Sequence, residues 1–307
     1  MDAVELTREL IKIESTDPGS WETRVGEYIC NYLKESGADT ETYEVEQGRK
    51  IVKGVVKGAK AHPALVFICH MDTVVKGEGW TKNAFSAEVS DGKIWGRGAC
   101  DMKSGLASAL TAFAEVAKSQ KENAEDIEKL PGTLVFIGTV DEEADMKGSE
   151  AAVQQGWIQK EDWVIDMEPT SGMIQMAHKG RTWFELSVEG ITAHASMPEK
   201  GADAIAGIAF MIAEIRKAMA KVPTHEELGK STVTFGQISG GYSPYVVSDH
   251  SMVTIDMRLV PPMNTQEAEK IVRKAIAIGE NAVPGVKGSY KITGDRPPVE
   301  THMESGL

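Results

Sequence analysis

The stretch LVFICHMD (residues 65–72) is apolar at nearly every position before His70 and closes on Asp72. A strand that is apolar on both faces is typical of a parallel sheet covered by helices. Two more such runs, residues 133–140 and 163–167, are each followed by acidic residues. Helical patterns separate the runs, so the order predicts an α/β fold with a mostly parallel sheet. Such sheets collect ligand-binding groups at the carboxyl ends of their strands.

From about residue 180 the pattern changes to strands with one apolar face, beginning with residues 182–189. A helix, two strands, a helix and a strand follow, up to about residue 292. This is the β-α-β-β-α-β order of a ferredoxin-like α+β domain. We expect it to be inserted into the first domain, to which the chain then returns. The predicted domains are residues 1–180, the insertion 181–292, and the incomplete return 293–307.

The composition indicates a globular protein and argues against some partners. The chain has 307 residues, of which 41% are hydrophobic and 26% charged. Its net charge is -13, from 33 Lys+Arg against 46 Asp+Glu, which disfavours nucleic acid and anionic membranes as partners. Its 3 cysteines form no even disulfide framework. With no signal peptide or membrane span evident, the expected location is the cytoplasm.

Imidazole and carboxylate groups lie where these apolar strands end. His70 is a candidate metal ligand, and a carboxylate at Asp72 can hold the other ring nitrogen. Asp101 lies in the glycine-rich segment GRGACDMKSG, where a carboxylate can bridge two ions about 3.5–4 Å apart. The adjacent Glu142 and Glu143 can divide metal binding and proton transfer between them. Glu168 follows the third strand and precedes Pro169.

Each of these signals is ordinary when taken alone. Isolated His-x-Asp and Glu-Glu pairs are usually solvated or structural, and an aspartate in a glycine-rich turn is usually a turn former. Their shared position at strand ends favours a two-metal site. A two-metal phosphatase or nuclease is a further alternative, disfavoured by the acidic charge and by the lack of a phosphate-binding loop.

Other polar residues are expected to serve the fold. Ser20 is predicted to cap a helix that carries Glu22 near its start. Arg97 and Lys103 flank Asp101, and we interpret both as structural salt-bridge partners.

Four blocks of the sequence resemble one enzyme family. HMDTV (70–74), GRGACDMKSG (96–105), DEE (141–143) and EPT (168–170) resemble the di-zinc aminoacylase/carboxypeptidase family in order and spacing. That family includes acetylornithine deacetylase, succinyl-diaminopimelate desuccinylase and glutamate carboxypeptidase. The resemblance implies a zinc-exopeptidase-like catalytic domain with an inserted lid that forms a homodimer. It also implies hydrolysis of the amide bond of an N-acyl amino acid or small peptide.

The same resemblance implies a role for each candidate ligand. His70, Asp101 and Glu168 would hold one Zn²⁺, and Asp101 would bridge to a second Zn²⁺ held by Glu143. Mixed oxygen and nitrogen ligands would also accept cobalt or manganese. In this family the peptide bond after Asp101 is typically cis.

Catalytic and substrate-binding residues are implied in the same way. Glu142 would be the general base, and the Asp72 carboxylate would hold the ring nitrogen of His70 that does not bind metal. His194, in GITAHAS, resembles the lid histidine that polarises the scissile carbonyl in the partner's site. Arg258 and Arg296 would bind the substrate carboxylate, for which a planar guanidinium is suited.

The chain departs from the family at two places. Tyr245 stands where relatives carry a substrate-contacting Asn. The C-terminal histidine that completes the second zinc site has no counterpart, because neither His178 nor His302 has the right setting. We therefore expect a C-terminally truncated chain whose second metal site lacks a ligand. The alternative is an inactive family member that dimerises and binds at most one metal.

Overall fold

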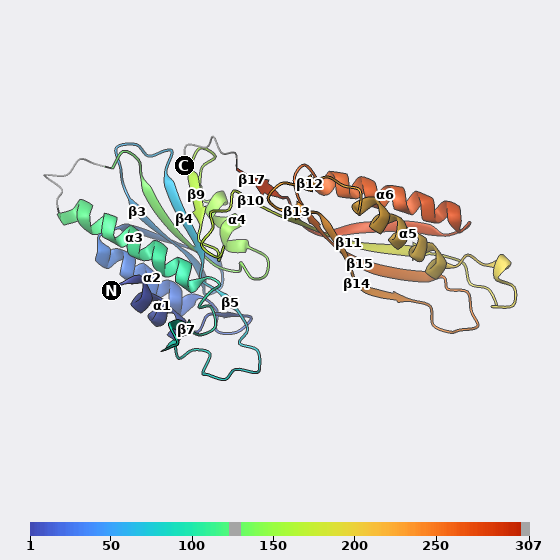
Figure 1. Cartoon of the computed structure of the whole chain (residues 1–307), viewed down its shortest axis with the longest axis horizontal. Helices are drawn as coiled ribbons and strands as arrows, with labels where there is room; N and C mark the ends of the chain where they lie inside the picture. Colours follow the sequence, from blue (N-terminus) through green and yellow to red (C-terminus); the bar gives the residue numbers. More distant parts are fainter. Residues whose placement is uncertain (123–129, 302–307) are drawn as a thin grey trace. The chain divides into compact units, whose positions relative to one another are not determined.

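The computed structural model describes residues 1–122 and 130–301. The chain forms two compact units, Met1–Met173 and a second that begins at Ile174 (Figure 1). The sequence places the first boundary at about residue 180, so the structure assigns a few more residues to the second unit. No helix in the described part of the chain has the length and apolar character needed to cross a bilayer.

The first unit is built on a five-stranded mixed sheet. Its strands β8 (Leu134–Thr139), β4 (Leu65–His70) and β9 (Trp163–Asp166) are mutually parallel, whereas β3 (Arg49–Val56) runs antiparallel to both β8 and β2 (Asp39–Glu46). The predicted α/β class is confirmed, with the parallel pairing at the strands that carry the candidate ligands. The strands lie in the order β2 (Asp39–Glu46), β3 (Arg49–Val56), β8 (Leu134–Thr139), β4 (Leu65–His70) and β9 (Trp163–Asp166).

In the part of this unit that the structure describes, four helices complete it: α1 (Ala3–Lys12), α2 (Thr23–Ser36), α3 (Lys103–Glu122) and α4 (Lys147–Gln154). Leu106, Leu110 and Phe113 of α3 are fully buried in one core with Val66 and Phe136 of the sheet. The ring of Phe113 meets Phe136 edge-on at 6.2 Å. Short strands form two further pairs: β1 (Thr16–Asp17) with β5 (Thr73–Val74), and β6 (Glu88–Ser90) with β7 (Lys93–Trp95).

The predicted cap at Ser20 is wrong. Helix α2 begins at Thr23, and its N-cap residue, Glu22, makes no capping hydrogen bond with its side chain. The Glu22 side chain is fully buried and binds Arg49 of β3 instead. A long-range ion pair therefore overrides the local capping preference.

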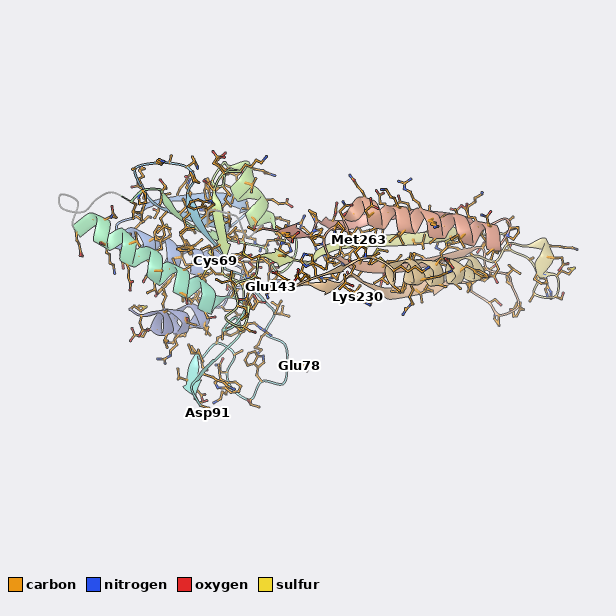
Figure 2. The ribbon with its side chains drawn as sticks, turned by 45° about the horizontal axis from the view of Figure 1, so that its top comes forward. Cys69, Glu78, Asp91, Glu143, Lys230 and Met263 are labelled. Carbon is orange, nitrogen blue, oxygen red and sulfur yellow. The ribbon has the colours of Figure 1, made fainter. Side chains whose placement is uncertain are left out.

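The second unit is a four-stranded antiparallel sheet with two helices packed on one face. Its elements follow the predicted β-α-β-β-α-β order, and the last strand extends four residues beyond the predicted end. Met263 belongs to its core (Figure 2). The principal elements are β11 (Gly180–Glu189), α5 (Ala204–Met219), β14 (Thr232–Gly240), β15 (His250–Leu259), α6 (Thr265–Ala282) and β16 (Lys287–Arg296). The minor ones are β10 (Ala177–His178), η1 (Pro198–Lys200), β12 (Thr224–His225), β13 (Gly229–Lys230) and β17 (Val299–Glu300).

Candidate metal centre

Parallel pairing brings the polar ends of the central strands of the first unit together. His70 is the last residue of β4 and lies in register with Thr139, the last residue of β8. The segment that follows β8 carries Glu142 and Glu143, and Glu168 follows β9. Asp101 comes from the turn that leads into α3, where the Asp101–Met102 peptide is cis, as the family resemblance implies.

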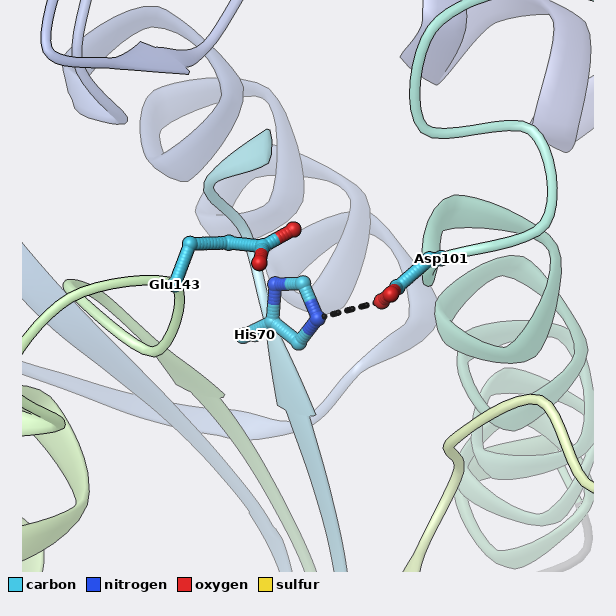
Figure 3. Close-up of side chains that lie close together, drawn as sticks. All are labelled: His70, Asp101 and Glu143. Atoms are coloured by element: carbon cyan, nitrogen blue, oxygen red, sulfur yellow. Dashed lines mark hydrogen bonds and ion pairs between the residues drawn. The ribbon is translucent and has the colours of Figure 1, made fainter. Parts of the chain in front are cut away.

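The five predicted ligand and base residues converge on the His70 ring. The ring nitrogen Nε2 lies 3.0 Å from Asp101 Oδ1 and 3.4 Å from Glu168 Oε1. Figure 3 shows Asp101 and Glu143 on either side of the ring. Ligand atoms fall within 4.8 Å of one another in two overlapping groups, His70–Asp101–Glu143 and His70–Glu142–Glu168. The structure therefore brings the predicted residues together in one cluster.

The orientation of His70 is set by the main chain. Its Nδ1 lies 2.9 Å from the carbonyl oxygen of Asp72. A carbonyl can only accept, so Nδ1 carries the proton and Nε2 is the nitrogen available to a metal. The Asp72 carboxylate was expected to make this contact, but its Oδ1 lies 3.7 Å from Nδ1. Its Oδ2 instead accepts a hydrogen bond from the Glu143 amide at 3.0 Å.

Electrostatics in this cluster favour a cation. Burial raises the pKa of Glu168 to about 7, with further repulsion from Asp166 and Asp101. Burial also raises the pKa of Glu142 and of Glu143. For His70, burial lowers the pKa, but the Asp101 hydrogen bond and the charges of Asp72 and Glu168 outweigh it and raise the pKa to about 11. In the metal-free protein, protons on His70 and Glu168 therefore offset part of the negative charge of the carboxylates.

This donor set fits one or two divalent cations. One imidazole nitrogen and several carboxylate oxygens within a few ångströms are typical ligands of Zn²⁺, and Co²⁺ or Mn²⁺ accepts the same set. A cation would take the place of the protons on Nε2 of His70 and on the carboxylates. His70, Asp101, Glu143 and Glu168 would hold it.

Comparisons with known proteins show the family to which the chain belongs. The model of peptidase family M20/M25/M40 matches residues 66–295. The chain belongs to this family. A Staphylococcus epidermidis protein named "Probable succinyl-diaminopimelate desuccinylase" is 28% identical over 230 residues, which are 74% of this chain and 54% of that protein. The chain thus spans about half the length of this relative.

Solved structures of the M20 family share the fold. The aminopeptidase PepT of Bacillus cereus has a TM-score of 0.74 at 23% identity, covering 99% of this chain and 78% of that one. The YXEP protein of Bacillus subtilis, described as a dinuclear metal binding peptidase, has a TM-score of 0.71 at 17% identity, covering 98% and 75%. Both likenesses support the mixed α/β class.

Sequence reasoning missed a buried ion network behind the metal centre of this M20 chain. The Arg49 guanidinium binds Glu22 at 2.9 Å, Asp17 at 2.7 Å and Asp141 at 3.1 Å. Asp141 directly precedes Glu142 and has a left-handed backbone (φ 67). Its amide also donates to Glu22 at 3.3 Å. The network therefore holds the segment that carries the predicted base.

The predictions for the two residues that flank Asp101 are wrong. Lys103 forms no salt bridge with any residue that the structure describes. Its buried ammonium donates to the carbonyls of Leu10 and Ile13 at 3.0 and 2.7 Å, at the C-terminal end of α1. This position suits a cation because helix C-termini carry partial negative charge. Arg97 donates to the Lys76 carbonyl at 3.1 Å.

The predicted lid residues lie in the second unit of the M20 chain. His194 is exposed, and its Nδ1 accepts from the Ser196 amide at 3.2 Å, so Nε2 carries the proton. The Arg258 guanidinium pairs with Asp256 at 2.9 Å. Arg296 ends β16, and Tyr245 is largely exposed. His178 lies in β10, while His302 and the end of the predicted return segment fall outside the described residues.

Metal affinity is expected to rise with pH, because a cation must displace the proton on His70 and the one on Glu168. The pKa of Glu168 is about 7, and that of His70 is about 11. Below pH 7 both protons compete, so affinity should rise by about 100-fold per pH unit; above it one proton competes, and the rise should be about tenfold. Zinc competition titrations between about pH 6 and about pH 8 measure this slope. A flat profile would contradict the protonation states given above.

Proposed function

We propose that this chain forms the catalytic core of a metal-dependent hydrolase that cleaves the amide bond of an N-acyl amino acid or small peptide. The observation that carries the proposal is the convergence of Glu142, a half-buried acid of raised pKa, with the ligand set around His70. The names of the relatives support the substrate class, since they include a desuccinylase and an aminopeptidase. Zn²⁺ is the proposed cofactor, and its proposed ligands are His70, Asp101, Glu143 and Glu168.

The proposed chemistry assigns proton transfer to Glu142. A bound divalent cation supplies Lewis acidity, which lowers the pKa of water and polarises a carbonyl. The raised pKa of Glu142 suits it to take a proton from the attacking water and to deliver that proton to the leaving amine. Asp72 fixes the backbone at Glu143 and so helps to keep the neighbouring Glu142 in place.

We assign substrate binding to the second unit, as a lid. The proton on Nε2 of His194 is a hydrogen-bond donor that suits a developing oxyanion. Arg258 and Arg296 are proposed to bind the substrate carboxylate. Arg258 already shows this geometry, because its Nε and a terminal nitrogen both bind the Asp256 carboxylate at 2.9 and 3.1 Å.

A substrate panel tests the proposal directly. Metal-stripped protein should not hydrolyse N-acetyl amino acids, N-succinyl amino acids or dipeptides, and added Zn²⁺ should restore hydrolysis of at least one class. Amine release measured with and without metal gives the result. Zinc binding at the His70 centre without turnover of any amide would contradict the proposal and would favour a non-catalytic family member.

Dimerisation is proposed to use the β14 edge of the second unit. The β14 sequence TVTFGQISG contains no charged residue, and Ile238 is 63% exposed. The opposite edge strand, β16, carries Lys287, Lys291 and Asp295. Charged residues protect sheet edges from pairing, so β14 is the edge left suited to a second copy of the chain.

Ile238→Lys is expected to convert the dimer into a monomer, because it places a charge at the centre of the proposed interface. Ile292→Lys is the matched control, since it changes an exposed isoleucine on the other edge strand. Analytical ultracentrifugation of both variants distinguishes the edges. A monomeric wild-type protein, or a dimer that survives Ile238→Lys, would rule out this interface.

A reducing compartment, and so the cytoplasm, is the proposed location. Cys30, Cys69 and Cys100 are all free thiols. Cys69 is buried directly before His70 (Figure 2), and burial raises the pKa of its thiol. An inert thiol beside the ligand set suits a protein that is not exposed to oxidants.

A further inference from the structure

Three arginines occupy one row of the sheet in the second unit. Arg181 on β11 lies in register with Arg258 on β15 and, on its other side, with Arg296 on β16. Directly opposed residues of antiparallel strands project from the same face, with Cα atoms about 4.5–5.5 Å apart. The three arginine side chains therefore project from neighbouring backbone positions on one face of the sheet.

This row belongs to the face of the sheet that the helices leave uncovered. Along β11, Thr182 and Phe184 are buried on the helix side. Arg181 and Trp183 alternate with them and point to the other side. Trp183 is 37% exposed, and the Arg181 guanidinium lies 4.0 Å from the centre of its ring. An aromatic ring in this position holds a guanidinium plane without neutralising it.

The charge of the row is only partly balanced. Like charges directly opposite each other on a sheet are destabilising. Asp256 pairs with Arg258. Arg181 forms no ion pair within residues 1–122 and 130–301, and its Nε is buried without a hydrogen-bond partner there. A bound anion would relieve the repulsion and satisfy this donor.

We propose that Arg181 extends the predicted carboxylate site into one for a dicarboxylate. The inference rests on the proposed function, in which Arg258 and Arg296 bind the substrate carboxylate. Arg181 adds a third planar fork beside them, suited to bidentate binding of a second carboxylate. The substrate class is then an N-acyl amino acid or peptide with two carboxylates, the second of them in the acyl group or in a side chain.

The test measures binding without turnover. Metal-free protein is used, so that no bound metal can hold a carboxylate, and calorimetry compares succinate with butyrate. These four-carbon acids differ by one carboxylate. Wild-type protein should bind succinate at least about tenfold more tightly, and Arg181→Gln should remove that preference. Arg216→Gln is the control, because Arg216 also lies over an aromatic ring (Phe235, 5.4 Å) but outside the row.

Further readouts separate binding from folding. Arg181→Lys keeps the charge but loses the fork, so an intermediate preference is expected. Trp183 emission should respond to succinate in the wild type and not in Arg181→Gln, with Trp183→Phe identifying the signal. Equal affinity for the two acids in the wild type, or a preference that survives Arg181→Gln, overturns the inference. If the protein hydrolyses amides but shows no preference for succinate, the dicarboxylate site is ruled out and the proposed function is not. If it prefers succinate but hydrolyses no amide, the proposed function is ruled out and the dicarboxylate site is not.

Discussion

Glu142→Gln is expected to lower kcat by about 10²–10⁴-fold while the protein still binds its full complement of metal. The glutamine is nearly isosteric but cannot accept a proton from water. Burial raises the pKa of Glu142, which favours proton transfer nearer to neutral pH, and the family resemblance implies that Glu142 is the base. Single-turnover kinetics together with metal analysis by mass spectrometry measure both quantities.

The adjacent residue provides the matched control. Glu143→Gln makes the same chemical change one position along, at a residue grouped with His70 and Asp101. Its main effect should be on metal affinity, by about 10–100-fold, and added metal should recover much of the activity. If both variants lose metal equally, or if Glu142→Gln keeps wild-type kcat, the assignment of base and ligand is incorrect.

Arg49→Met is expected to cost about 3–5 kcal/mol of unfolding free energy, because it leaves buried carboxylates without their counter-charge. The Glu22 side chain is 0% exposed and that of Asp141 4%. Burial already raises the pKa of Glu22 against the lowering influence of Arg49. Removing the guanidinium should therefore drive protonation of Glu22 and loosen the segment that carries Glu142.

Urea unfolding followed by circular dichroism measures this loss. Arg24→Met is the control, because Arg24 lies exposed in the first turn of the helix that follows Glu22. A surface substitution of this kind should change stability by at most about 0.5 kcal/mol. If Arg49→Met is as stable as Arg24→Met, the network contributes little to the fold.

The fold was predictable because its signals are local. The continuous apolar run of β4 and the alternating run of β11 each reveal how many faces of the strand are covered. The position of the candidate metal centre followed from the same runs, since His70 ends one strand and Glu142 and Glu168 come shortly after two others. The short pairing of β10 with β17 was not predicted, because it has no periodic signal.

Residues whose roles depend on distant partners could not be predicted. Glu22 looks like a first-turn helix residue until β3 places Arg49 beside it. Lys103 looks like a salt-bridge partner, yet it binds the end of a helix some ninety positions earlier in the chain. The row through Arg181 depends on strand register, and a β-bulge between Trp183 and Phe184 alters the pairing with β16. This change of register could not be predicted from one sequence.

The hydrogen bond from His70 Nδ1 to the main-chain oxygen of residue 72 has a consequence for protein engineering and for natural variation. Every amino acid offers that oxygen, so the imidazole keeps its tautomer whatever side chain stands there. Asp72→Asn should thus leave the ring correctly oriented, while it removes a charge that raises the pKa of His70 and disturbs the neighbouring acidic loop. The nitrogen available to a metal, Nε2 of His70, therefore keeps its lone pair in place when the side chain at position 72 is substituted.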